Sequence, residues 1–113
     1  MSEATNEWID VCAADELEAG DWRTVWIDDD EQVAVIKCDG GIHAIQDVCT
    51  HDGGILTGGR IIGCAIECPR HGARFDIRSG AVLAPPAYEP IATYPVKIRD
   101  GRVFVGTEPD IPG

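Results

Sequence analysis

Two short segments in the middle of the chain combine cysteine with histidine. They read Cys49-Thr50-His51 and Cys68-Pro69-Arg70-His71, with 16 residues between His51 and Cys68. Thiolates and neutral imidazoles are ligands that proteins use for transition metals. Two loops could therefore each present one thiolate and one imidazole to a common metal centre.

This pairing by type suits an iron-sulfur cluster with mixed ligation, in which two thiolates bind one iron and two imidazoles bind the other. Glycines follow both segments and would let backbone N–H groups approach the bridging sulfides closely. The alternative is a structural zinc site with two cysteines and two histidines. Zinc sites usually separate paired ligands by two or more residues, whereas a single residue separates Cys49 from His51. The tight spacing favours ligands that reach two different irons.

The segments that must position these ligands have the patterns of β-strands. Apolar residues alternate with polar ones or form runs rich in Val and Ile, and turn residues separate these runs. Hairpin turns are expected at residues 28–31, 39–41 and 100–101, joining strands at 22–27, 32–38, 42–48, 94–99 and 103–106. Only residues 13–19 look helical, and this stretch is too short for more than a turn or a short surface helix. We expect an all-β fold, a small antiparallel sandwich or barrel.

Between residues 49 and 90 the strand pattern gives way to loops rich in glycine and proline. Long loops in a compact β domain usually carry function. No repeat and no low-complexity tract interrupts the chain. We therefore expect one domain over residues 1–113, with a cluster-binding subdomain at about 48–90.

The chain has 113 residues and a net charge of -11. Residues 1–59 carry 14 acids and 2 bases, and residues 60–113 carry 6 acids and 7 bases, so the two parts hold -12 and +1. This balance argues against nucleic acid and anionic membrane surfaces as partners. The first residues do not have the charged-then-apolar pattern expected of a leader, and the unbroken apolar runs are only a few residues long. A soluble, cytoplasmic protein is expected.

Three of the five cysteines lie outside the two metal-binding segments. An odd number of cysteines in a reducing compartment argues against a disulfide framework. Cys12, Cys38 and Cys64 lie in apolar, strand-like surroundings and are expected to be buried free thiols. His43 is expected to be an ordinary sheet residue rather than a ligand. Aromatic packing in the core or at the sheet rims is expected for Trp8, Trp22, Trp26 and Tyr94.

The two metal-binding segments resemble the motif of the Rieske family, which is Cys-x-His, a spacer of about this length, and Cys-x-x-His. The resemblance extends from Ala44 to Asp76, and Pro85-Pro86 falls where the family has a third loop that covers the cluster. It implies a 2Fe-2S cluster in a Rieske-like fold, with Cys49 and Cys68 on the inner iron. His51 and His71 would bind the outer, partly exposed iron.

Several branches of the family are disfavoured by the residues present. A catalytic oxygenase subunit also needs two histidines and a carboxylate for a mononuclear iron, and only His43 is left for such a site. Quinol-oxidising members add a membrane anchor and a pair of cysteines, joined by a disulfide, at the positions of Gly54 and Arg70. High-potential members place serine and tyrosine hydroxyls where this chain has Ala73 and Phe75.

What the resemblance implies is a low-potential ferredoxin, an electron carrier that is not itself an enzyme. Its implied partners are a flavin-dependent ferredoxin reductase and a terminal oxygenase of the aromatic-ring-hydroxylating type, both bound transiently. A monomer is expected. The alternative is the small Rieske subunit of an assimilatory nitrite reductase, which would hold a permanent partner.

Overall fold

The computed structural model describes residues 7–110, and strands dominate this part of the chain. Eleven strands form three sheets with the orders β1-β11-β10, β2-β3-β4-β9 and β5-β6-β7-β8, and all paired strands run antiparallel. A single turn of 3-10 helix covers Ala14–Glu16 within the expected helical stretch. The expected all-β antiparallel fold is confirmed. The strands are β1 (Trp8–Ala13), β2 (Trp22–Trp26), β3 (Gln32–Cys38), β4 (Gly41–Gln46), β5 (Ile61–Ile62), β6 (Ala65–Glu67), β7 (Arg74–Asp76), β8 (Val82–Ala84), β9 (Thr93–Tyr94), β10 (Val96–Arg99) and β11 (Arg102–Gly106).

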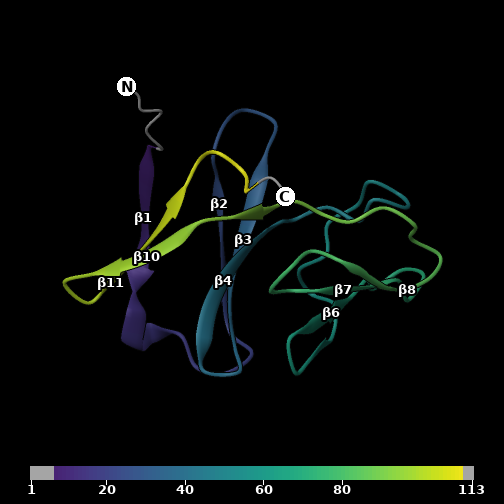
Figure 1. The fold of residues 1–113 in the computed structure, drawn as a ribbon, viewed down its shortest axis with the longest axis horizontal. Helices are drawn as coiled ribbons and strands as arrows, with labels where there is room; N and C mark the ends of the chain where they lie inside the picture. Colours follow the sequence, from purple (N-terminus) through teal and green to yellow (C-terminus); the bar gives the residue numbers. More distant parts are fainter. Residues whose placement is uncertain (1–6, 111–113) are drawn as a thin grey trace.

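The third sheet stands apart from the other two. Figure 1 shows β6, β7 and β8 at the right of the molecule, while the strands of the first two sheets lie at the left. The sheet β5-β8 and its loops come from one continuous segment between β4 and β9. The predicted cluster ligands all fall in this segment.

Strand β3 is buried on both faces and joins the two cores. Val33 and Val35 pack into the core shared with β1 and β11. Ala34 and Ile36 point the other way, into the core beneath the ligand loops. Successive side chains of a strand point to opposite faces, so one continuous apolar run serves both cores.

Two hairpins use the turn that their Asp-Gly sequences predict. Asp39 and Gly40 have φ of 50° and 76°, and Asp100 and Gly101 have φ of 52° and 77°. Each pair forms a two-residue connection between antiparallel strands, β3 to β4 and β10 to β11. Positive φ at both central positions is the requirement of the type I′ turn, in which Asp-Gly is favoured.

Other sequence expectations needed correction. The strand expected at 94–99 is divided at Pro95 between β9 and β10, which belong to different sheets, because proline supplies no N–H to a ladder. Tyr94 is buried as expected, whereas Trp26 is 62% exposed on β2, the edge strand of its sheet. Strand β1 was not predicted from the sequence.

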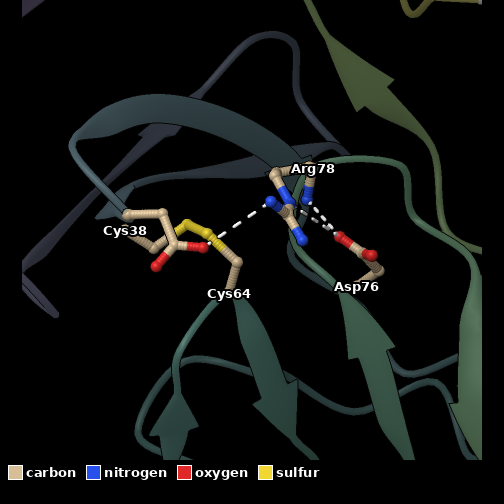
Figure 2. Close-up of a disulfide and its surroundings, with 5 residues drawn as sticks. Cys38, Cys64, Asp76 and Arg78 are labelled. Carbon is tan, nitrogen blue, oxygen red and sulfur yellow. Dashed lines mark hydrogen bonds and ion pairs between the residues drawn. A yellow bond between two sulfur atoms is a disulfide. The ribbon is translucent and has the colours of Figure 1, made fainter.

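The largest correction concerns two of the three extra cysteines. Cys38 and Cys64 form a disulfide, with their Cα atoms 5.3 Å apart (Figure 2). Cys38 ends β3 on the face that packs against the third sheet, and Cys64 lies in the turn between β5 and β6. The prediction of free thiols was wrong because the fold brings together residues 26 positions apart in sequence. Cys12 is a buried free thiol, as predicted.

Over the described residues 7–110, no helix has the length and apolar character that crossing a membrane requires.

Candidate metal centre

The first ligand loop is a tight turn closed by two backbone hydrogen bonds. The N–H of Cys49 donates to the carbonyl of Gly54 at 2.7 Å, and the N–H of Gly53 donates to the carbonyl of Cys49 at 2.7 Å. Gly53 has φ of 77°, a conformation that favours glycine. The carboxylate of Asp52 also accepts the N–H of Gly54 at 2.9 Å. The loop is thus held by its own backbone.

The second ligand loop repeats the same arrangement. The N–H of Cys68 donates to the carbonyl of Ala73 at 2.7 Å, and the N–H of Gly72 donates to the carbonyl of Cys68 at 3.1 Å. Gly72 has φ of 81°. In both loops a cysteine opens the turn and a glycine with positive φ stands four residues later. The glycine after each Cys/His segment is therefore required by the turn.

The two loops place their thiols inside and their imidazoles outside. Cys49 is 0% and Cys68 is 1% exposed, whereas His51 and His71 are both exposed. The two imidazole rings face each other edge to face with centroids 5.2 Å apart. The sulfurs of Cys49 and Cys68 lie within 4.8 Å of each other. The structure thus brings all four predicted residues together as a buried thiol pair and an exposed imidazole pair.

Asp52 lies between the two pairs. One of its oxygens is within 4.8 Å of both sulfurs, and one is within the same distance of a ring nitrogen of each histidine. The Arg70 guanidinium hydrogen-bonds to this carboxylate and holds the pKa of Asp52 well below its usual range, with the N–H of Gly54 adding to the effect.

Burial raises the pKa of the Cys49 thiol, while the backbone N–H groups of Asp52 and His51 oppose this by hydrogen-bonding to the sulfur. Donors aimed at a sulfur stabilise negative charge on it. The local backbone is therefore suited to a thiolate in a buried place.

Arg70 links the two ligand loops. Its Nε donates to one oxygen of Asp52 at 2.6 Å and its Nη2 donates to the other at 3.0 Å, while Nη1 donates to the carbonyl of Ile55 at 3.0 Å. A Cβ atom at Gly54 would lie 2.5 Å from the Arg70 Cζ, so the guanidinium fits only over a glycine. The positions of Gly54 and Arg70 are thus adjacent across the loops, and an ion pair connects the loops there.

Sequence reasoning missed Asp47, the only buried charged or polar residue in the described part of the chain. One carboxylate oxygen accepts the N–H groups of Leu56 and Thr57, both at 2.9 Å. The other accepts the Thr57 hydroxyl at 2.8 Å and the Gln32 amide at 2.8 Å. Asp47 therefore ties the chain that leaves the first ligand loop to β3. In the sequence, the only feature that could have drawn attention to Asp47 is its position two residues before Cys49.

The segment around Pro85-Pro86 reaches the first ligand loop. The Thr50 hydroxyl donates to the carbonyl of Glu89 at 2.6 Å. Ala87 is 1% exposed, whereas Tyr88 beside it is 85% exposed. This is the place expected for the third loop, with one residue anchored in the core and its neighbour in solvent.

The donor set fits a 2Fe-2S cluster with mixed ligation. Buried thiols supply the anionic ligands, exposed imidazoles supply the neutral ones, and backbone N–H groups point toward a sulfur. Fold and site together define a class of small antiparallel β proteins that carry such a centre on two loops.

Comparison with known proteins gives the family. The model of the Rieske [2Fe-2S] domain matches residues 7–95. The chain belongs to this family. It is 38% identical over 104 residues to the ferredoxin component of the naphthalene 1,2-dioxygenase/salicylate 5-hydroxylase systems of Ralstonia sp, covering 92% of this chain and 99% of that protein.

Two solved structures support the same assignment. A chain in the complex of reduced oxygenase and oxidised ferredoxin of carbazole 1,9a-dioxygenase is 30% identical, with a TM-score of 0.90 over 96% of this chain and 100% of that one. A putative NADH-dependent nitrite reductase small subunit from Mycobacterium tuberculosis is 26% identical, with a TM-score of 0.79 over 91% of this chain and 96% of that one. The curated relatives are electron-transfer components of dioxygenase systems, as expected from the sequence.

Proposed function

We propose that this protein carries single electrons from a flavin-dependent ferredoxin reductase to a terminal oxygenase of the aromatic-ring-hydroxylating type. The observation that carries the proposal is the pairing of two buried thiols with two exposed imidazoles on adjacent loops. The likeness to ferredoxin components of dioxygenase systems, and to a chain from a complex of a ferredoxin with an oxygenase, supports an oxygenase as the kind of partner.

In this proposal Cys49 and Cys68 hold the inner iron of a 2Fe-2S cluster, and His51 and His71 hold the outer one. When bound, the cluster supplies reversible one-electron chemistry. The protein's own part is to keep water from the thiols and to hold the imidazoles at the surface, where a partner can approach closely. The Arg70 link and Asp47 keep the two loops in place.

The docking face in this proposal surrounds the two histidines. Tyr88 on the third loop and Ile55 after the first loop are 85% and 51% exposed. An exposed aromatic and an exposed aliphatic residue beside the redox site suit a small, transient interface. The Arg70 guanidinium is engaged by Asp52 and by the carbonyl of Ile55, so it acts here as a link between the loops rather than as a docking contact.

A reconstituted electron-transfer assay tests the proposal. The holoprotein is mixed with the reductase and terminal oxygenase of a naphthalene dioxygenase system, and substrate oxidation is followed with and without this chain. We expect oxidation to depend on the chain and to stop when His71 is replaced by Ala. A cluster-loaded protein that the reductase cannot reduce would contradict the proposed direction of flow.

The second candidate, a small subunit of an assimilatory nitrite reductase, is supported by the likeness to the mycobacterial small subunit. The two functions predict different assembly states. A carrier is a monomer that leaves its partner at each cycle, whereas a subunit stays bound. Size-exclusion chromatography of the native protein from its own cells separates them.

We also propose that the carrier lies in the cytoplasm, together with the flavin-dependent reductase that reduces it. The proposal treats residues 1–113 as one domain with a cluster-binding subdomain at about 48–90. Cell fractionation tests the location, and a single unfolding transition shared by cluster absorbance and far-UV circular dichroism tests the domain.

A further inference from the structure

A second group of metal-binding side chains lies where β3, β4 and the third sheet meet. The sulfurs of Cys38 and Cys64 and a ring nitrogen of His43 all lie within 4.8 Å of one another. None of the three is among the proposed cluster ligands. We call Cys38, His43 and Cys64 the junction site.

Strand register explains why His43 faces the two sulfurs. Cys38 pairs with Gly41 and Ile36 pairs with His43, so the side chains of all four positions share one face of the sheet. Gly41 has no side chain, and a Cβ atom there would lie 3.0 Å from the His43 Nε2. The imidazole occupies this space and reaches toward the cysteines. Gly41 is therefore what allows the histidine to join the site.

A second connection accompanies the disulfide. Arg78 lies beside it, as Figure 2 shows, with its Nε 3.7 Å from a carboxylate oxygen of Asp76. Its Nη1 is 3.6 Å from an oxygen of Asp39, in the turn that follows Cys38. The Arg78–Asp39 pair joins the same two parts of the fold as the disulfide, whereas Arg78 and Asp76 both belong to the segment of the third sheet. Cys38 and Cys64 also belong to one buried core. Breaking the S–S bond would therefore leave the three side chains close together.

The surroundings also suit a cation. Asp39 and Asp76 contribute two negative charges and Arg78 contributes one positive charge, so the net charge of this group is negative. His43 and Arg78 line a surface pocket, which gives dissolved ions a route to the imidazole. Two thiolates and one imidazole form a ligand set that zinc uses, with a fourth position left for water.

We propose that Cys38, Cys64 and His43 form a redox-gated site for a thiophilic divalent cation of the zinc class. The disulfide form binds no metal, because its sulfurs are not thiolates. A dithiol reductant breaks the S–S bond, supplies two electrons and two protons, and becomes a disulfide itself. Zinc then displaces the two thiol protons and binds both sulfurs and the neutral imidazole. A disulfide-class oxidant reverses the step and releases the metal.

The test uses the cluster-loaded protein under anaerobic conditions, in a disulfide form and in a form treated with a phosphine reductant that is then removed. Each form is incubated with zinc and desalted, and its zinc, iron and sulfide are measured. We expect about one zinc per chain in the reduced form and none in the disulfide form. Unchanged iron and sulfide show that zinc has not entered the cluster loops.

Variants separate this site from other thiols. His43→Asn keeps both cysteines, and we expect it to bind zinc at least roughly tenfold more weakly in competition with a chromophoric chelator. Cys12→Ser removes the one thiol that belongs neither to the junction site nor to the ligand loops, and this variant should bind zinc like the wild type. Cys64→Ser cannot form the disulfide and leaves one thiol at the site, so it should bind no zinc with or without the reductant.

Three results would overturn the proposal. One is a reduced wild-type protein, verified by thiol counting, that takes up no zinc. Another is equal affinity in wild type and His43→Asn. The third is a disulfide that the reductant cannot open while the fold and cluster stay intact, because the site could then never form.

Discussion

Arg70 connects the two ligand loops without a covalent bond. Quinol-oxidising members are expected to have a disulfide at the positions of Gly54 and Arg70. Here a two-pronged hydrogen bond from Arg70 to Asp52 connects the loops at that place. Arg and carboxylate geometries match in this way, and the pair gives orientation as well as attraction. A reversible ion pair thus replaces a covalent link next to the redox centre.

Replacing Arg70 by Ala should loosen both ligand loops without removing a ligand. We expect several-fold faster loss of cluster absorbance in the presence of an iron chelator. The matched control is Arg74→Ala, which removes an exposed ion pair to Glu67 with an N–O distance of 3.1 Å in the same subdomain. Equal rates of loss in the two variants would show that Arg70 does not hold the loops together.

Ala73 and Phe75 offer no hydroxyl, and both are fully buried beside the second ligand loop. Ala73→Ser and Phe75→Tyr should each raise the midpoint potential, since a donor aimed at a cluster sulfur favours the reduced form. A gain of about 1–2 kcal/mol corresponds to about 40–85 mV for one electron. Voltammetry measures the shift, with Phe104→Tyr in another sheet as the control. Unshifted potentials with an intact cluster would show that these positions do not face the sulfurs.

At the residue scale the sequence indicated four residues that the structure brings together, but it did not indicate their surroundings. The four residues could be predicted because their types and their spacing in the sequence indicate a metal centre without knowledge of the fold. Asp47 and the disulfide partners could not be found in this way. Asp47 is identified by its four hydrogen bonds and Cys64 by its position opposite Cys38, and both depend on how distant segments pack.

At the scale of elements, β3 and the first ligand loop depend on each other. β3 offers one face to each core, and the Gln32 side chain at its start donates to Asp47. Asp47 in turn holds the chain that follows the ligand loop. The strand predicted from its run of Val and Ile, Gln32–Cys38, was found in full. The strands of two or three residues in the third sheet were missed, because such short runs carry no period to detect.

Asp47→Ala should destabilise the fold by about 2–3 kcal/mol, because the buried N–H groups of Leu56 and Thr57 lose their acceptor. Thr57→Val removes only the hydroxyl that shares this carboxylate and should cost about 1 kcal/mol. Denaturant unfolding of the loaded proteins measures both. If the two variants lose equal stability, the buried carboxylate does not hold the loop as described.

At the scale of the whole molecule, the net negative charge comes from the first part of the sequence, which also contains the first ligand loop. The net charge of -11 is the sum of -12 from residues 1–59 and +1 from residues 60–113. Within the ligand-bearing segment, Arg70, Arg74 and Arg78 all pair with nearby acids. The arginines near the histidines are thus paired with acids, and Ile55 and Tyr88 are the large exposed apolar side chains beside the ligand loops, so we expect partner binding there to depend on them.

Tyr88→Ala tests that expectation. We expect electron transfer to the oxygenase to slow by roughly fivefold to tenfold at limiting carrier concentration, since exposed aromatics are frequent hot spots. The midpoint potential should not change. Ile98→Ala is the control, because Ile98 is 55% exposed on β10, in a different sheet from the ligand loops. A larger effect from Ile98 than from Tyr88 would move the docking face to the other sheets.

The ligation by Cys49, His51, Cys68 and His71 is the central claim, and one measurement tests it most directly. The protein is purified anaerobically from cells fed histidine labelled with nitrogen-15, analysed for iron and acid-labile sulfide, reduced, and studied by pulsed EPR. The account predicts two irons and two sulfides per chain and coupling to two histidine nitrogens that persists in His43→Asn. One zinc without sulfide, or coupling that disappears in His43→Asn, would contradict it.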